Sequence, residues 1–133
     1  MNNCIFCEIV KGNVPSSKIY EDDFTFAFFD INPVNEYHTL VIPKKHYENI
    51  FDIPENEALN LMKAIKKIVD LYNCKLNLKN VQIINNNGTE AQQDVFHIHF
   101  HIIPRYCGDN QNIKQTRHSR LRERFDELLE KLQ

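Results

Sequence analysis

The stretch HIHFHIIPR, residues 97–105, places a histidine at every second position and follows each histidine with an apolar residue. Successive side chains of a β-strand point to opposite faces, so this alternation predicts a strand with one imidazole face and one core face. The imidazole face carries His97, His99 and His101, and the core face carries Ile98, Phe100 and Ile102. A chemical site on this strand is therefore the leading hypothesis.

The composition is typical of one globular domain that spans residues 1–133. Of the 133 residues, 42% are hydrophobic and 26% are charged, which is enough to build a core without disulfides. The net charge of -2 and the pI near 6.3 give no overall attraction for nucleic acid or for an anionic membrane. We therefore expect no nucleic-acid partner and no membrane partner. The basic stretch 114–124 is either a solvated surface segment or a patch that binds an anion or a partner.

Signals for export and membrane insertion are missing from the sequence. No apolar run approaches the roughly 20 residues that span a bilayer, and the first residues lack the basic and apolar regions of a signal peptide. The sequence thus predicts a soluble, cytoplasmic protein. In such a protein, four cysteines that include a close C-x-x-C pair indicate metal or redox chemistry more than disulfides.

Local patterns predict the order of helices and strands. Residues 4–12 form a short helix ended by Gly12, residues 18–30 form a hairpin with an acidic turn at 21–23, and residues 38–43 form a strand stopped by Pro43. Apolar side chains recur at helical spacing over residues 55–73, and a further strand begins at Val81. This order predicts an α+β domain with a largely antiparallel sheet of about five strands and a long central helix.

The last segment predicts an amphipathic helix over residues 119–133 with Ser119 as its N-cap. Its apolar face consists of Leu121, Phe125, Leu128, Leu129 and Leu132. This face needs a surface to cover, either the sheet of the same protomer or another subunit. The chain is thus divided into a core over residues 4–106 and a C-terminal helical extension over about 119–133.

Cys4 and Cys7 have a spacing that lets two thiolates bind one metal ion. Two histidines would complete a closed tetrahedral Cys2His2 set, whereas a redox pair would need a strand leading into a helix. The spacing does not tell which histidines close the set, although His46 and His97 both lie at predicted strand ends. His38 is equally consistent with a hydrogen-bonded, half-buried histidine and with an active-site role, and His118 is interpreted as a solvated residue of the basic segment.

If His97 binds metal, His99 is free to act as a nucleophile near neutral pH, where imidazole is also a competent proton carrier. A carbonyl or carboxylate that accepts from one ring nitrogen would fix its tautomer and leave a lone pair for the substrate. His101 is then placed to protonate a leaving group or to hold a phosphoryl oxygen. A catalytic metal bound by the triad itself is the alternative, but the cupin and amidohydrolase patterns fit this chain poorly.

The run HIHFHII resembles the signature of the histidine-triad superfamily. The segments 4–23, 27–46 and 83–88 are similar to those of its nucleotide-binding branch, especially the bacterial, zinc-containing members. The resemblance implies a HIT-like fold and a hydrolase or transferase that attacks the α-phosphorus of a nucleoside phosphoramidate, dinucleoside polyphosphate or acyl-nucleotide. A nucleotidyl-histidine intermediate would form on His99, and a nucleoside monophosphate such as AMP would be released.

The resemblance also implies roles for individual residues. One structural Zn²⁺ per chain would be bound by Cys4, Cys7, His46 and His97. His101 would contact the phosphate and leaving group, Asp30 the ribose hydroxyls, and Asn86 the phosphate region, with His38 close behind the site. The base would lie between apolar walls formed by Ile5, Phe6, Ile9, Phe28 and Ile31. The loop over residues 92–95 is expected to hold the α-phosphate with its backbone amides.

The chain departs from the family pattern in two places. Gln92 stands where glycine is common, and Asp94 stands where a small hydroxyl residue often binds phosphate, so we expect Asp94 to turn aside or to tune leaving-group preference. Gln93 is expected to keep a polar contact with the nucleotide. The chain has no tryptophan for the family's contact across the dimer, so a homodimer, the expected assembly, would use the helix from Ser119 instead. The alternative function is a purine-nucleotide-binding regulatory or scaffold protein whose hydrolysis is incidental.

Overall fold

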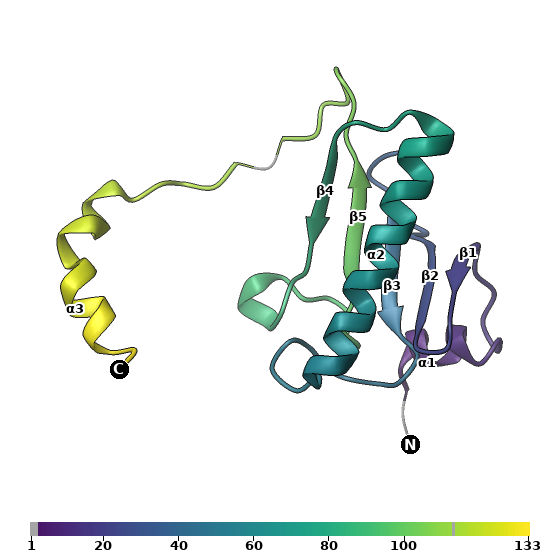
Figure 1. Ribbon diagram of the computed structural model, residues 1–133, viewed down its shortest axis with the longest axis horizontal. Coiled ribbons are helices and arrows are strands. Elements are labelled where there is room, and N and C mark those ends of the chain that lie inside the picture. The colour runs from purple at the N-terminus through teal and green to yellow at the C-terminus, as the bar shows by residue number, and fades with distance from the viewer. Residues whose placement is uncertain (1–2, 113) are drawn as a thin grey trace.

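The computed structural model describes residues 3–112 and 114–133, and its centre is a five-stranded antiparallel sheet (Figure 1). The strands lie in the order β1-β2-β3-β5-β4, and each pairs with its neighbours in antiparallel register. Their bounds are β1 Lys18–Glu21, β2 Thr25–Phe29, β3 Thr39–Pro43, β4 Val81–Ile84 and β5 Phe100–Pro104. The predicted α+β class with a largely antiparallel sheet is confirmed.

Two helices cover opposite faces of this sheet. Side chains along β3 alternate between these faces, so neighbouring residues of the strand pack in separate cores. Val41 packs with the long helix α2, Glu55–Leu76, whereas Leu40 and Ile42 pack with the short helix α1, Ile5–Val10. The α2 layer is buried around Leu61, Ala64, Ile65, Ile68 and Tyr72. The α1 layer is buried around Phe6, Ile9, Phe26 and Phe28. The face covered by α1 is also the face that carries the triad, because Phe6 packs against both His97 and His99.

The ends of both helices follow from local chemistry. Pro54 precedes α2, whose first turn carries Glu55 and Glu57, and Asn77 ends the helix in the left-handed conformation at φ 54°. Gly12, at φ 81°, turns the chain after α1 as the sequence predicts. Within the described residues, no helix is long and apolar enough to cross a membrane.

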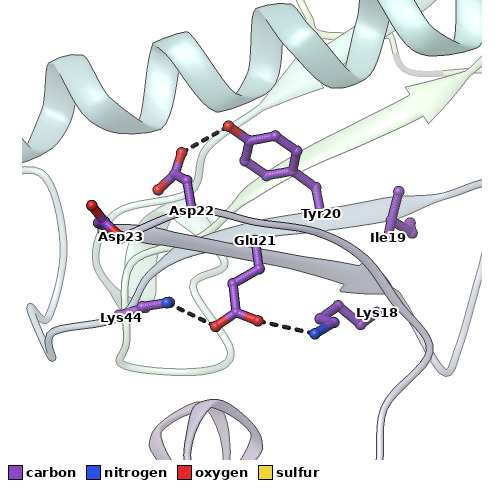
Figure 2. Close-up of a pocket in the computed structure, with 7 residues that line it drawn as sticks. All are labelled: Lys18, Ile19, Tyr20, Glu21, Asp22, Asp23 and Lys44. Carbon is purple, nitrogen blue, oxygen red and sulfur yellow. Dashed lines mark hydrogen bonds and ion pairs between the residues drawn. The ribbon is translucent and has the colours of Figure 1, made fainter.

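The hairpin of β1 and β2 is fixed by the acidic turn that the sequence predicts. Asp22 Oδ1 accepts from the backbone N–H groups of Phe24 and Thr25, both at 2.8 Å, and Asp22 Oδ2 accepts from the Tyr20 hydroxyl at 2.8 Å. On the other side of the strand, Glu21 pairs with Lys18 and Lys44 (Figure 2). Glu21 and the two lysines thus pair within this surface hollow, while Asp22 holds the turn beside it.

The strand of the triad begins later than predicted. β5 starts at Phe100, so His97 and His99 precede it, outside the sheet, and residues 95–97 form a bend. The reason is a different backbone partner: the N–H of Ile98 donates to the carbonyl of Tyr47 at 2.7 Å, in the loop after β3. The two-residue alternation nevertheless persists, because His97 and His99 are buried on the α1 face and Ile98 and Ile102 are buried in the core.

The C-terminal segment differs from the single helix predicted over 119–133. It forms a 3₁₀ helix, η2 Ser119–Arg124, followed by the short helix α3, Phe125–Glu130. Ser119 is not an N-cap; that position belongs to His118, whose side chain makes no capping hydrogen bond. All of these residues are exposed, and α3 stands apart from the sheet (Figure 1). A short helix without a packing surface lacks the main source of helical stability.

Candidate active site and metal centre

The N-terminus of α1 brings two thiols beside two imidazoles. Cys4 precedes the helix and Cys7 lies in its first turn, while His46 follows β3 and His97 precedes β5. The Sγ atoms of the cysteines and the Nδ1 atoms of the histidines all lie within 4.8 Å of one another. His97 Nδ1 is 3.3 Å from Cys4 Sγ, 3.5 Å from Cys7 Sγ and 3.2 Å from His46 Nδ1. Sequence analysis predicts these four residues, and the structure brings them together.

The spacing of these four atoms fits a tetrahedral ion. A tetrahedron with metal–ligand bonds of 2.0 to 2.3 Å has edges of roughly 3.3 to 3.8 Å. His97 Nε2–H donates to the carbonyl of Pro43 at 2.9 Å, so its Nδ1 lone pair is directed at the cluster. Without a cation, burial and the Cys4 thiol raise the pKa of Cys7 to about 11. A bound cation would offset this cost by stabilising both thiolates, and the fourth ligand would leave no open position for water.

His99 presents the opposite ring nitrogen. Its Nδ1–H donates to the backbone carbonyl of His97 at 2.9 Å, so Nε2 is the unprotonated nitrogen of the neutral ring. The ring is buried against the edge of Phe6, with 5.2 Å between ring centroids. Asn85 holds the backbone behind it, because the Asn85 side-chain N–H donates to the carbonyl of His99 at 3.0 Å. The orientation of His99 is therefore fixed from both sides, as a nucleophilic nitrogen requires.

His101 is oriented through His38 and the loop before β3. The backbone N–H of Val34 donates to His38 Nδ1 at 3.1 Å, so neutral His38 carries its proton on Nε2. That proton is donated to His101 Nδ1 at 3.0 Å, and Asp30 Oδ2 lies 3.5 Å from the same His38 nitrogen. His101 in its neutral form therefore carries its proton on Nε2. It presents a hydrogen-bond donor where His99 presents a lone pair.

Burial keeps this second pair of histidines neutral. Desolvation, together with His99 and His38 nearby, lowers the pKa of His101 to about 4. Desolvation also lowers the pKa of His38, although the Asp30 carboxylate opposes that shift. Of the two roles expected for His101, donation to a phosphoryl oxygen suits a neutral imidazole better than proton transfer to a leaving group.

His99 and His101 open onto a cavity of about 200 Å³ between α1 and the sheet. Its apolar walls include all five residues named from the sequence: Ile5, Phe6, Ile9, Phe28 and Ile31. Ile31 lies at the rim with 87% of its surface exposed, and Asp30 lines the cavity as well. Asn32, Leu40 and Val95 also line it, and sequence analysis did not single them out. The cavity thus combines apolar walls with two carboxylates, Asp30 and Asp94, and two imidazoles, the mixture of apolar and polar groups that is typical of a small-molecule site.

Other residues predicted at the nucleotide lie elsewhere. Asn86 lines a separate hollow with Gln82, Glu90 and Lys114. Gln93 is buried, its Nε2 donating to the carbonyls of Glu48 and Val95 and its Oε1 accepting from Gly88 N–H. The structure thus places Gln93 inside the loop, where its amide already has partners for both donors.

The loop amides differ from the expectation too. The N–H groups of Gln92 and Gln93 donate to the carbonyls of Thr89 and Gly88, and the N–H of Val95 donates to Asp94 Oδ1 at 2.9 Å. The expected use of these three amides for phosphate is therefore not supported. Asp94 does not turn aside, since the same Oδ1 lies 3.4 Å from His99 Nε2.

Asn85 is the positioning residue that sequence analysis missed. It belongs to a run of three asparagines, residues 85–87, and composition alone gives no reason to separate them. The structure does separate them: Asn85 bonds the His99 carbonyl, while Asn87 donates to Asn85 Oδ1 and accepts from the N–H of Ile50 at 2.8 Å. The available signal was its position, because Asn85 directly follows β4, the strand that pairs with β5 beside the triad.

The family model described as the HIT domain matches residues 11–108. The chain belongs to the HIT family. This confirms the resemblance read from the motifs. A HIT-like protein of Methanocaldococcus jannaschii, described as uncharacterised, is 50% identical over 111 residues, which span 84% of this chain and 85% of that protein. An adenosine 5'-monophosphoramidase of Candida albicans is 38% identical over 109 residues, which span 77% of this chain and 70% of that enzyme.

Solved structures agree with the HIT fold. A HIT family protein from Bacillus anthracis matches with a TM-score of 0.91 at 36% identity, covering 98% of this chain and 95% of that one. A zinc-bound histidine triad family protein from Mycobacterium smegmatis matches with a TM-score of 0.79 at 32% identity, covering 97% of each chain. The HIT-like fold predicted from the sequence is therefore confirmed.

Proposed function

We propose that this HIT protein hydrolyses nucleotide conjugates of the type AMP-X, above all adenosine 5'-phosphoramidates, through a covalent intermediate on His99. One observation carries the proposal: the His99 Nδ1–H bond to the His97 carbonyl leaves Nε2 unprotonated in the neutral ring, and His99 lines the cavity between α1 and the sheet. The likeness to an adenosine 5'-monophosphoramidase supports the substrate class. Dinucleoside polyphosphates are the second substrate class to test.

In the proposed reaction, His99 Nε2 attacks the α-phosphorus and the leaving group X departs with the bonding electron pair. The Nε2–H of His101 donates to a phosphoryl oxygen and stabilises its developing charge. Asp30 accepts from the ribose hydroxyls, and Phe6, Ile9 and Phe28 enclose the base. Water then attacks the nucleotidyl-histidine, releases a nucleoside monophosphate and returns His99 to its starting form.

We propose zinc as the ion for the Cys4, Cys7, His46 and His97 cluster, because two thiolates and two imidazoles at tetrahedral spacing suit Zn²⁺. When bound, the ion would supply structural cross-linking and would not activate water. It would hold the start of α1, and with it the cavity wall at Ile5 and Phe6, against the ends of β3 and β5. A reaction centred on a metal at the triad is disfavoured, since His97 and His99 direct opposite ring nitrogens to different places.

We also propose a homodimer in the cytoplasm. Apolar side chains are left exposed on α2, at Leu59 and Met62, and on the edge strand β4, at Ile83. The exposed apolar residues of η2 and α3 have no surface beneath them in one protomer (Figure 1). A second copy is the simplest cover for these surfaces. Light scattering coupled to size exclusion would give twice the monomer mass, and a monomer at micromolar concentration would contradict the proposal.

The experiment that tests the proposed reaction uses the full chain with adenosine 5'-phosphoramidate and, separately, diadenosine tetraphosphate. Mass spectrometry of the quenched reaction should find adenylylated His99, and His99→Ala should lose at least about 1000-fold in kcat while still binding AMP. His118→Ala, on the exposed C-terminal segment, is the matched control. If neither substrate is turned over and AMP alone binds, the protein is a nucleotide-binding regulator or scaffold instead.

A further inference from the structure

A second cavity adjoins the nucleotide cavity and has been given no role so far. It measures about 500 Å³ and is lined by Asn3, Glu48 and Phe96 together with two metal-centre residues, Cys4 and His46. Ile5, Asp94 and Val95 line both cavities. The two spaces are therefore neighbours that meet along these three residues, beside the reactive nitrogen of His99.

Asp94 stands at this junction with its carboxylate facing the reaction. Its Oδ1 lies 3.4 Å from His99 Nε2 and accepts from the Val95 N–H, while 77% of the side chain is exposed. A phosphoryl group under attack must approach Nε2, so it arrives next to this carboxylate. The leaving group is bonded to the same phosphorus as the nucleoside. It is then the part of the substrate that lies next to Asp94.

The second cavity has an acidic and aromatic lining. Asp94 and Glu48 supply two carboxylates, Phe96 supplies an aromatic surface that is 44% exposed, and the lining contains no lysine or arginine. Two thiolates would neutralise a divalent ion in the adjoining metal centre, so the ion adds no net positive charge. Such a lining attracts a cation with an alkyl stem and repels an anion.

From this geometry we infer that the second cavity is a leaving-group subsite. In this subsite, Asp94 selects substrates whose leaving amine carries a positive charge elsewhere, such as an ammonium group at the end of its alkyl chain. The inference rests on the proposed hydrolysis at His99 and narrows its substrates. It favours phosphoramidates of cationic amines over dinucleoside polyphosphates, whose leaving group is a polyanion. Asp94 is a specificity residue here, because it contacts the leaving group and takes no part in bond formation.

The reaction balances without a further reagent. The bond from His99 Nε2 to the α-phosphorus forms, the phosphorus–nitrogen bond breaks, and the electron pair stays on the amine nitrogen. That nitrogen takes one proton from solvent as the bond breaks. When water hydrolyses the nucleotidyl-histidine, one proton returns to solvent, so the net products are the nucleoside monophosphate and the amine.

The subsite walls are held by the buried Gln93. Its Nε2 donates to the carbonyl of Glu48 at 2.7 Å and to the carbonyl of Val95 at 3.0 Å. The two backbones that carry the acidic lining are thus joined by one side chain. A fixed backbone lowers the cost of ordering these side chains when a ligand binds.

The test compares three adenosine 5'-phosphoramidates that differ only in the charge at the end of the N-linked group. These are the 2-aminoethyl compound, the neutral propyl compound and the carboxymethyl compound. We would measure kcat/KM for wild type, Asp94→Asn and Glu48→Gln, with Asp70→Asn as the control. Asp70 lies on α2, across the sheet from both cavities, and its loss removes the same charge together with only an exposed ion pair to Lys66.

Wild type should prefer the 2-aminoethyl compound to the carboxymethyl compound. Asp94→Asn should reduce that preference at least about fivefold, the effect of one unit charge at about 4 Å in water. Glu48→Gln should shift it the same way, and Asp70→Asn should not. An unchanged preference in Asp94→Asn, with the propyl compound still hydrolysed, would overturn the subsite and leave the proposed hydrolysis intact. If wild type hydrolyses none of the three compounds, the proposed hydrolysis fails and the subsite with it.

Discussion

His97 and His99 lie two residues apart and are locked in opposite tautomers by backbone carbonyls. His97 donates from Nε2 to Pro43, and His99 donates from Nδ1 to His97 itself, both at 2.9 Å. One imidazole thus turns Nδ1 to the cysteines and the next turns Nε2 to the nucleotide cavity. A step of two residues along the chain thus separates the proposed metal ligand from the proposed nucleophile.

The support behind His99 gives the first prediction. Replacing Asn85 by alanine removes the donor to the His99 carbonyl, and the ring then loses part of its fixed orientation. We expect kcat to fall by about 3- to 10-fold, in line with about 1 kcal/mol for one hydrogen bond, while the Kd for AMP is unchanged. Steady-state kinetics and calorimetric titration with AMP measure the two quantities. Asn112→Ala, at an exposed position, is the control, and an equal loss in both variants would remove the special role of Asn85.

The link from His38 to His101 gives the second prediction. His38→Phe keeps a ring of similar size but removes the Nε2–H that fixes the His101 tautomer. We expect a drop of about tenfold in kcat with little change in KM, because the lost contact orients a group that acts on the phosphoryl oxygens. His38→Gln keeps a side-chain N–H and should recover part of the rate. If the kcat of His38→Gln is no higher than that of His38→Phe, His38 contributes packing alone.

The metal centre gives the third prediction. The protein as purified should contain one zinc per chain by elemental analysis, and Cys7→Ser should reduce both metal content and the melting temperature. Chelation should lower stability and activity together, because the ion ties α1 and its cavity wall to the strand ends. Cys74→Ser, at an exposed position outside the cluster, is the control. Activity that disappears on chelation while the melting temperature stays constant would instead indicate a catalytic metal.

Much of this architecture could be predicted because it depends on patterns within short stretches of the sequence. The alternation around Val41, the helical spacing over α2 and the turn at Asp22 each report burial or hydrogen bonding within a few residues. The four cluster ligands could be named because C-x-x-C demands partners, and the family resemblance selected His46 and His97. These predictions depend on residue type and spacing, which the sequence contains directly.

The predictions that failed depend on contacts between distant segments. Gln93 was expected at the nucleotide, yet its amide joins the carbonyl of Val95 to that of Glu48, which lies 45 residues before Gln93 in the chain. The late start of β5 likewise follows from the bond between Ile98 and Tyr47. The prediction of a single C-terminal helix was wrong for a related reason: an apolar stripe is stabilised as a helix by packing, and among the described residues those from 119 to 133 are all exposed.

The buried histidines give the last prediction, on pH. His101 has a pKa near 4 in the folded state, and burial lowers that of His38 as well, whereas both titrate near 6.5 when the chain is unfolded. Between these values the unfolded chain binds more protons, so the free energy of unfolding must fall as the pH drops from about 6.5 towards 4. Each such proton contributes a slope of at most about 1.4 kcal/mol per pH unit. Urea unfolding of His101→Asn across this range should show a shallower slope than wild type. Equal slopes would mean that His101 is protonated in the folded protein, and its assignment as a neutral donor to phosphate would then be wrong.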